Sequence, residues 1–217
     1  NPERLEKIVR HILSIHEKKT KNREFCAMFC VSSVENLIQY YELFEKVQAE
    51  MAEEAKRNES YFQPISVRTI FSYATEEQDQ QASIEETEAG MIAEEPVDAP
   101  NSVDESRKAK LDRYIAQYNA TYRSSYNTTD SFYDYYQNLG KRVKFYNIKY
   151  EKDEQIDLLL VVNMFLTGFD SKPLNTIYVD KNLKYHGLIQ AFSRTNRVYK
   201  PFKPFGNVVC YRNLKQA

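Results

Sequence analysis

The sequence predicts an α/β fold in which helices flank a mostly parallel β-sheet, and three observations support this. The segment IDLLLVV (156–162) contains a continuous apolar run, LLLVV, which is typical of a central strand buried on both faces. Two more strand-like segments follow, NTIYVDK (175–181) and GNVVCYR (206–212), with the helix-like HGLIQAFSRTNR (186–197) between them. Only 5 glycines occur in 217 residues, which disfavours a loop-rich β architecture. Residues 1–217 are therefore interpreted as one domain.

The N-terminal part predicts a helix followed by a buried strand. Asn1 and Pro2 are typical of the cap and first turn of a helix. The apolar residues after them recur at helical spacing and are Leu5, Ile8, Ile12 and Ile15. The short apolar run in REFCAMFCV (23–31) predicts a strand inside the sheet.

A second helix and a further strand are predicted next. Ser32-x-x-Glu35 fits a capping box, and the helix behind it is expected to extend to about Lys56. Its apolar stripe consists of Val34, Leu37, Ile38, Tyr41, Phe44 and Val47. The alternation in ISVRTIFSY (65–73) predicts a strand.

An acidic segment divides the chain. Between Thr75 and Ser106 there are 11 acidic residues and no Lys or Arg. The segment is nearly free of aromatic residues and shows no hydrophobic periodicity, so residues 75–106 are predicted to be a flexible, disordered insertion. An interaction tail is the alternative interpretation of such a charge run.

Two tyrosine-rich helices are predicted after the acidic segment. The stripe of the first, in residues 107–123, is Leu111, Ile115, Tyr118 and Tyr122. The stripe of the second, near residues 130–147, is Phe132, Tyr136, Leu139, Val143 and Tyr146. Aromatic stripes at this spacing are more often part of a core than a stacking surface for nucleic-acid bases. Gly140 lies inside the second stripe and argues against an unbroken helix.

Composition limits the classes of protein. Outside the acidic segment the chain has 20 acidic and 30 basic residues, which suits either a polyanionic partner or a solvated surface of mixed charge. Three cysteines do not make a disulfide framework, so a reducing compartment is expected. Cys26 and Cys30 are interpreted as buried thiols and no metal site is predicted. No apolar run approaches the roughly 18 residues of a membrane span.

The segment LIQAFSRTNR (188–197) carries the most specific polar pattern. Helical spacing puts Gln190, Arg194 and Arg197 on one face, and an opposite face of Leu188, Phe192 and Thr195 is suited to packing on the sheet. The planar guanidinium group suits phosphate oxygens, so two arginines one turn apart are suited to an oligophosphate. The alternative is that they pair with carboxylates on a solvated face.

The loop LTGFD (166–170) directly follows the first of the three C-terminal strands. Ligands of open parallel sheets bind beyond the carboxyl ends of the strands. Gly168 permits a close backbone or ligand approach, and Asp170 is suited to accept a hydrogen bond from a ribose hydroxyl. Asp180 and Lys181 end the next strand at the same edge, so we expect one cleft there. A glycine-containing turn with a capping aspartate is the simpler alternative.

These motifs together resemble a known family. The stretch VVNMFLTGFDSKPLNTIYVDKNLKYHGLIQAFSRTNR (161–197) is similar to motifs V and VI of the motor (R) subunit of type I restriction enzymes, a helicase-like DNA translocase of superfamily two. The resemblance covers residues 156–212, and the strand at 25–31 with its following helix fits motif IV more loosely. It implies a RecA-like fold, here the second, C-terminal of the two motor domains that sandwich ATP.

The resemblance also implies roles in ATP hydrolysis. Arg197 matches the arginine finger, and Arg194 matches its companion near the γ-phosphate. Gln190 is expected to orient that motif. Gly168 and Asp170 match the motif V positions that link the nucleotide state to DNA.

The same resemblance implies contacts with the DNA backbone. Thr167 is a candidate for a phosphate contact, and Ser32 and Ser33 are further candidates in motif IV.

Other motifs of the motor are absent from this sequence. No G-x-x-x-x-G-K-[ST] phosphate loop, acidic Walker-B sequence or nuclease-like cluster occurs in it. In the family these belong to the preceding RecA-like and nuclease domains, which would hold most of the ATP and Mg²⁺. This chain alone is therefore not expected to hydrolyse ATP, and no cofactor is expected to bind it firmly.

The resemblance implies that the partners are double-stranded DNA, the preceding domains of the same chain, and the methyltransferase and specificity subunits. It also implies a cytoplasmic location in a bacterium or archaeon, without membrane contact. The alternative function is a non-catalytic α/β module that binds DNA or another subunit. A helicase of another branch, such as an RNA helicase, fits the TGFD and QAFSRTNR forms less well.

Overall fold

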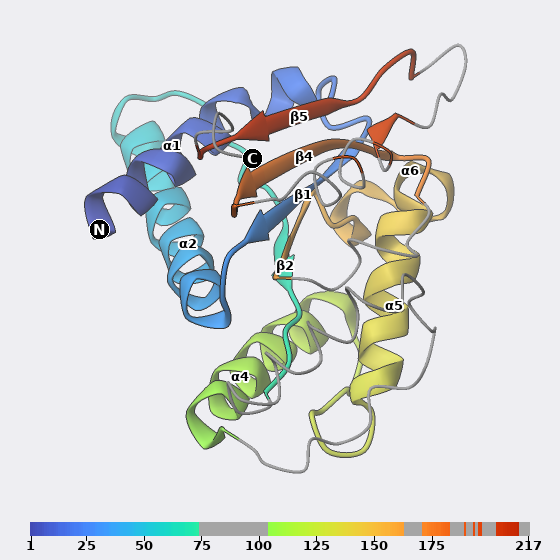
Figure 1. Ribbon diagram of the computed structural model, residues 1–217. Coiled ribbons are helices and arrows are strands. Elements are labelled where there is room, and N and C mark those ends of the chain that lie inside the picture. The colour runs from blue at the N-terminus through green and yellow to red at the C-terminus, as the bar shows by residue number, and fades with distance from the viewer. Residues whose placement is uncertain are drawn as a thin grey trace.

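The computed structural model describes residues 1–73, 104–162, 171–182, 189, 193, 195–196 and 203–212. Its centre is a five-stranded sheet in the order β2-β3-β1-β4-β5, and every neighbouring pair is parallel (Figure 1). The strands are β1 (Cys26–Val31), β2 (Val67–Thr69), β3 (Leu158–Val161), β4 (Leu174–Asp180) and β5 (Asn207–Cys210). The predicted α/β class with a parallel sheet is confirmed. The three central strands are buried along their whole length, which explains why β1 and β3 are continuously apolar and why β4 is apolar apart from Asn175, Thr176 and Asp180.

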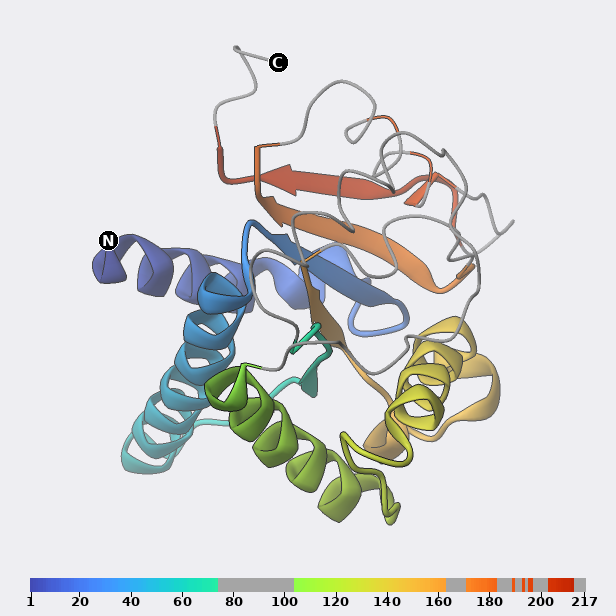
Figure 2. The ribbon, with the colours of Figure 1, turned by 60° about the horizontal axis from the view of Figure 1, so that its bottom comes forward.

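Helices α1 (Pro2–Lys19) and α2 (Val34–Arg57) pack side by side against the sheet (Figure 2). The Asn1 side chain caps α1 by accepting a hydrogen bond from the Glu3 amide. On the sheet, Phe29 of β1 contacts two aromatic rings of α2, Tyr40 and Phe44. This face therefore buries the apolar stripes predicted for both helices.

Helices α4 (Glu105–Tyr122), α5 (Phe132–Lys144) and α6 (Tyr146–Lys149) and a short 3₁₀ helix (Lys152–Glu154) form the rest of the described helical structure. The Cys26 thiol, which points to the sheet face opposite Phe29, donates a hydrogen bond to the Val143 carbonyl of α5. Gly140 is buried within α5 and does not interrupt it. The predicted second stripe is instead divided at Phe145, where α5 ends.

The tyrosine stripes belong to the core, as predicted. Of the predicted tyrosines, Tyr118 and Tyr146 are fully buried, and Tyr122 and Tyr136 are partly buried against the core. Helix α4 lies along α2, where Lys110 and Arg113 pair with Glu42. The acidic groups of α2 and the basic groups of α4 thus fix the two helices side by side.

A buried carboxylate organises the amino-terminal edge of the sheet. Asp157 precedes β3 and is only 1% exposed. Its oxygens accept hydrogen bonds from the Arg23 guanidinium at 2.5 Å, from the Tyr146 hydroxyl at 2.6 Å and from the Ser66 amide at 2.7 Å. Because buried charges require partners, this network joins segments distant in sequence into one rigid edge.

Three predicted boundaries are wrong. Helix α2 is capped by Ser33, whose side chain accepts from the Asn36 backbone amide, and not by Ser32, whose hydroxyl is instead bonded to the Asn36 side chain. Strand β2 covers only residues 67–69 of the predicted 65–73. The predicted insertion at 75–106 extends too far, because Asp104 already caps α4. Residues 74–103 lie outside the described residues.

Candidate functional site

The carboxyl-terminal edge of the sheet is the candidate site, because ligands of open parallel sheets bind there. In this edge Val31 at the end of β1 pairs with Asp180 at the end of β4. Cys210 at the end of β5 pairs with Val179 of β4. The residues that follow these three strands therefore lie next to one another, as the sequence predicted for Asp180.

Ser32 and Ser33 connect β1 to α2 at this edge. Ser32 is exposed, and its hydroxyl oxygen accepts a hydrogen bond from the Asn36 side-chain amide at 2.8 Å. Ser33 is half-buried and caps α2. Both serines thus lie at the N-terminus of a long helix, where the helix dipole favours anions. Their predicted DNA contact stays a prediction.

The remaining predicted site residues lie outside the described part of the chain. They are Thr167, Gly168, Asp170, Gln190, Arg194 and Arg197. Within the arginine segment the structure describes Ile189, which is 51% exposed, and Thr195, which is 2% exposed. The burial of Thr195 agrees with its predicted place on the face opposite the arginines.

Gly206 allows Thr195 to pack directly against the start of β5. A Cβ atom on Gly206 would lie 2.2 Å from the Thr195 Cβ and 2.4 Å from its carbonyl oxygen. No side chain fits in that space, so the close approach requires glycine. The contact fixes where the chain between Arg194 and Arg197 meets the sheet.

The strongest interactions at the described edge converge on one carboxylate. We call Arg4, Tyr40, Asp180 and Arg212 the Asp180 cluster. Arg4 donates two hydrogen bonds to Asp180, at 2.5 Å to Oδ1 and 3.0 Å to Oδ2. The Tyr40 hydroxyl donates to Oδ2 at 2.6 Å, and Arg212 Nε donates to Oδ1 at 3.0 Å. Helices α1 and α2 and the chain after β5 are thereby tied to the end of β4.

Asp180 is ionised in this environment. Its side chain is 1% exposed, and burial alone would raise the pKa of the carboxyl. Hydrogen bonds from Arg4 and Tyr40 and the charges of Arg4 and Arg212 outweigh burial and hold the pKa below its usual value. Burial and the Asp180 hydrogen bond raise the pKa of Tyr40, which keeps its hydroxyl protonated as a donor.

The Asp180 cluster changes the interpretation of this residue. The sequence predicted Asp180 as part of an open ligand cleft, whereas its two oxygens are occupied by four donated hydrogen bonds. It therefore orients arginines. Neither Arg4 nor Arg212 was a predicted site residue, because no local pattern links them to a carboxylate 176 or 32 positions away. The one usable signal was an aspartate at the end of an apolar strand.

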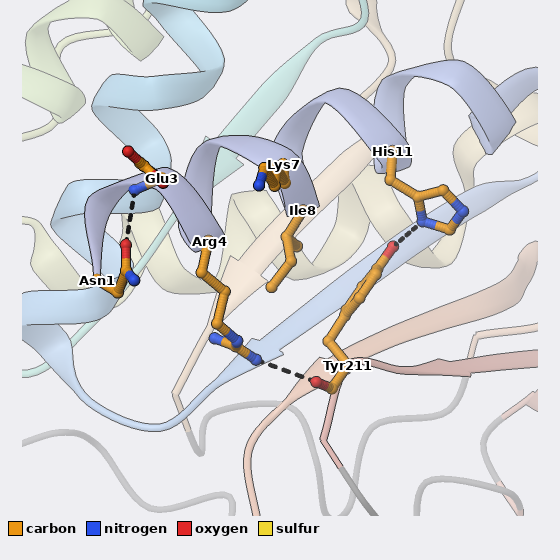
Figure 3. Close-up of a pocket in the computed structure, with 7 residues that line it drawn as sticks. All are labelled: Asn1, Glu3, Arg4, Lys7, Ile8, His11 and Tyr211. Atoms are coloured by element: carbon orange, nitrogen blue, oxygen red, sulfur yellow. Dashed lines mark hydrogen bonds between the residues drawn. The ribbon is translucent and has the colours of Figure 1, made fainter.

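A groove lies beside this cluster (Figure 3). The residues that line it are Asn1, Glu3, Arg4, Lys7, Ile8, His11 and Tyr211, and we call it the α1 groove. Its volume is about 460 Å³. Tyr211 closes one side, where its hydroxyl lies 3.0 Å from His11 Nδ1 and its carbonyl accepts from Arg4.

A family model described as "Type I restriction enzyme subunit R domain 3" matches residues 23–213. The chain belongs to the R-subunit family of type I restriction enzymes. The match begins just before β1 and includes every strand of the sheet. The RecA-like α/β class that the motif resemblance implied is thus confirmed for this R-subunit segment.

Two staphylococcal endonuclease subunits are similar over almost the whole chain, and a mycoplasma relative is similar over a shorter part. The endonuclease subunit SauMRSORF196P of Staphylococcus aureus (strain MRSA252) is 41% identical over 213 residues, covering 98% of this chain and 19% of the relative. The endonuclease subunit SsaAORF53P of Staphylococcus saprophyticus is 43% identical over 214 residues, covering 99% and 20%. A putative MpnIIP endonuclease subunit N-terminal part of Mycoplasma pneumoniae is 58% identical over 53 residues, covering 24% and 14%. The chain spans about a fifth of the length of the two staphylococcal relatives.

In the described part of this R-subunit segment, no helix has the length and hydrophobicity needed to cross a membrane.

Proposed function

We propose that this chain is the second motor domain of a type I restriction R subunit and supports ATP-driven translocation of double-stranded DNA. The observation that carries the proposal is the R-subunit family match over residues 23–213, which includes the LTGFD and QAFSRTNR motifs. The parallel sheet supports it, because its carboxyl edge is the edge from which RecA-like domains present ligand-binding residues.

In this proposal Arg197 is the arginine finger, and Arg194 contacts the same phosphates. Gln190 orients the arginines, and Gly168 and Asp170 link the nucleotide to the DNA. The preceding RecA-like domain of the same polypeptide holds ATP and Mg²⁺. An arginine supplied across the domain interface stabilises the charge that develops on the transferred phosphoryl group.

The DNA backbone passes the same edge of the sheet. Thr167, Ser32 and Ser33 contact phosphates, and the N-terminus of α2 favours these anions. The methyltransferase and specificity subunits of the restriction complex, in the cytoplasm of a bacterium or archaeon, are the proposed protein partners. The staphylococcal relatives are named as endonuclease subunits, and DNA cleavage would require domains outside this chain.

The test is the substitution Arg197→Ala in the full-length R subunit. The DNA-stimulated ATPase rate should fall by roughly 10³–10⁵, the range known for arginine fingers. Arg57→Ala is the matched control, because Arg57 is exposed in the last turn of α2. Its rate should equal that of the wild type, as should the thermal unfolding of both variants.

A near-normal rate for Arg197→Ala would remove the arginine-finger role. If the enzyme still required this domain for binding DNA, the non-catalytic binding module would then be the better description.

A further inference from the structure

Arg212 uses only part of its hydrogen-bonding capacity within the Asp180 cluster. Its Nε donates to Asp180 Oδ1 at 3.0 Å, and its side chain is 33% exposed. Within the described ranges, its two terminal nitrogens make no hydrogen bond. Arg4 differs, because both of its terminal nitrogens bond to Asp180 and one also bonds to the Tyr211 carbonyl. The Asp180 carboxylate therefore holds Arg212 in one orientation and leaves its outer donors available.

The charges of the Asp180 cluster do not cancel. One carboxylate faces two guanidinium groups, and the side chains of Arg4 and Arg212 are 40% and 33% exposed. Such a cluster keeps one positive charge at a partly open surface. An arginine that is already oriented loses less conformational entropy when it binds an anion.

A further cation extends this charge along α1. Lys7 is exposed, lines the α1 groove one turn after Arg4, and makes no ion pair within the described residues. Glu3 is the carboxylate that lines the same groove (Figure 3). The cations Arg212, Arg4 and Lys7 thus follow one another from the end of β5 along the first turns of α1.

This arrangement suits a chain of phosphates better than a single small anion. Arg4 and Lys7 line the groove of about 460 Å³, and Arg4 shares the Asp180 carboxylate with Arg212. Val31 pairs with Asp180, so Ser32 at the N-terminus of α2 follows the strand next to Asp180, and Arg212 lies on the other side of β4 at the same edge of the sheet. A DNA strand that contacts Ser32 can therefore also reach Arg212 along the carboxyl-terminal edge of the sheet. Guanidinium and ammonium groups both bind phosphodiester oxygens.

We propose that Arg212 and Lys7 are DNA-backbone contacts of this domain and that Asp180 positions Arg212 for the phosphate. This inference deepens the proposed motor function and rests on it. Arg4 links the two contacts by fixing the first turn of α1 to Asp180.

The experiment measures the equilibrium binding of full-length R subunit to a short duplex without a recognition site, in the absence of ATP. The dissociation constant is determined at several salt concentrations between 50 and 200 mM. Arg212→Gln and Lys7→Gln should each reduce the slope of log affinity against log salt by about 0.9, the value for one phosphate contact. When the salt concentration is lowered from 200 to 50 mM, the affinity of each variant should therefore rise about 3.5-fold less than that of the wild type.

Arg10→Gln is the matched control, because it removes the same charge from α1. Arg10 is already paired with Glu6 and Glu50, so its slope should equal that of the wild type. Arg212→Gln leaves Asp180 with Arg4 and Tyr40, and Lys7→Gln changes an exposed side chain without a described partner, so both variants should fold. If Arg212→Gln lowered the melting temperature, the salt slope of Lys7→Gln would be the deciding measurement.

Wild-type slopes for both Arg212→Gln and Lys7→Gln would overturn the inference while leaving the motor proposal intact. A wild-type subunit whose DNA binding did not depend on salt, or that did not bind DNA, would instead count against the proposed function itself.

Discussion

Substituting Gly206 with alanine places a methyl group where Thr195 already lies. The added Cβ would be 2.2 Å from the Thr195 Cβ, 2.4 Å from its carbonyl oxygen and 2.5 Å from Oγ1. The hydroxyl can rotate away, but the other two atoms are fixed to the backbone. The chain around Thr195 and the start of β5 must therefore separate.

The size of this overlap sets the expected loss of stability. Carbon atoms in contact prefer a separation of about 3.5–4.0 Å, so the two segments must move apart by more than about 1 Å. Overpacking of a tight site typically costs about 1–3 kcal/mol. Because two of the three close atoms cannot move independently of the backbone, we expect a loss of about 2–3 kcal/mol for Gly206→Ala.

Urea and thermal denaturation of the 217-residue chain measure this loss. For a chain of this size, about 2–3 kcal/mol corresponds to a melting temperature lower by about 5–10 °C. Phe205→Ala is the control, because the neighbouring Phe205 side chain is 60% exposed and its truncation should change stability by less than about 0.5 kcal/mol. If the free energy of unfolding of Gly206→Ala were within about 0.5 kcal/mol of the wild-type value, the close packing of Thr195 on Gly206 would be wrong.

Two further predictions concern buried ionisable groups. Burial lowers the pKa of His16 to about 4. Between about pH 6.5 and 4 the unfolded chain therefore binds a proton that the folded chain does not. The free energy of unfolding should fall by about 3 kcal/mol as the pH drops through this range. Neither ring nitrogen has a hydrogen-bond partner in the described structure, so His16→Phe should remove this part of the pH dependence in urea titrations at stepped pH; an unchanged pH profile would contradict the assignment. Burial also raises the pKa of the Cys30 thiol to about 12 and that of Cys26 further, whereas Cys210 is half-buried. A thiol reagent at neutral pH should therefore label Cys210 first and reach the other two only on unfolding, and equal labelling rates would contradict the burial of β1.

The elements of the fold were predictable because their signals are local. Asn1 and Pro2 start α1, and the apolar runs of β1 and β3 have the length and continuity of buried parallel strands. The errors lie at boundaries, where a single hydrogen bond decides. The capping-box pattern favoured Ser32, whereas the hydrogen bond from the Asn36 amide makes Ser33 the cap.

The candidate site was predictable only in part. Its place at the carboxyl edge follows from the order of strands and helices, and Asp180 was recognised there. Its partners Arg4, Tyr40 and Arg212 come from three different elements, and no periodicity in the sequence brings them together. Such contacts are set by how helices pack on the sheet, which the hydrophobic pattern constrains only coarsely.

The two buried aspartates at opposite edges of the sheet differ in the balance of their charges. At the amino edge, Asp157 faces a single guanidinium, Arg23, whose side chain is 16% exposed, so the charges balance and the edge is closed. At the carboxyl edge, Asp180 faces both Arg4 and Arg212, which are more exposed, so positive charge remains. A carboxylate that only stabilised the fold would need one cation. The second cation at the carboxyl edge fits the proposed DNA contact, because a phosphate there would balance the remaining positive charge.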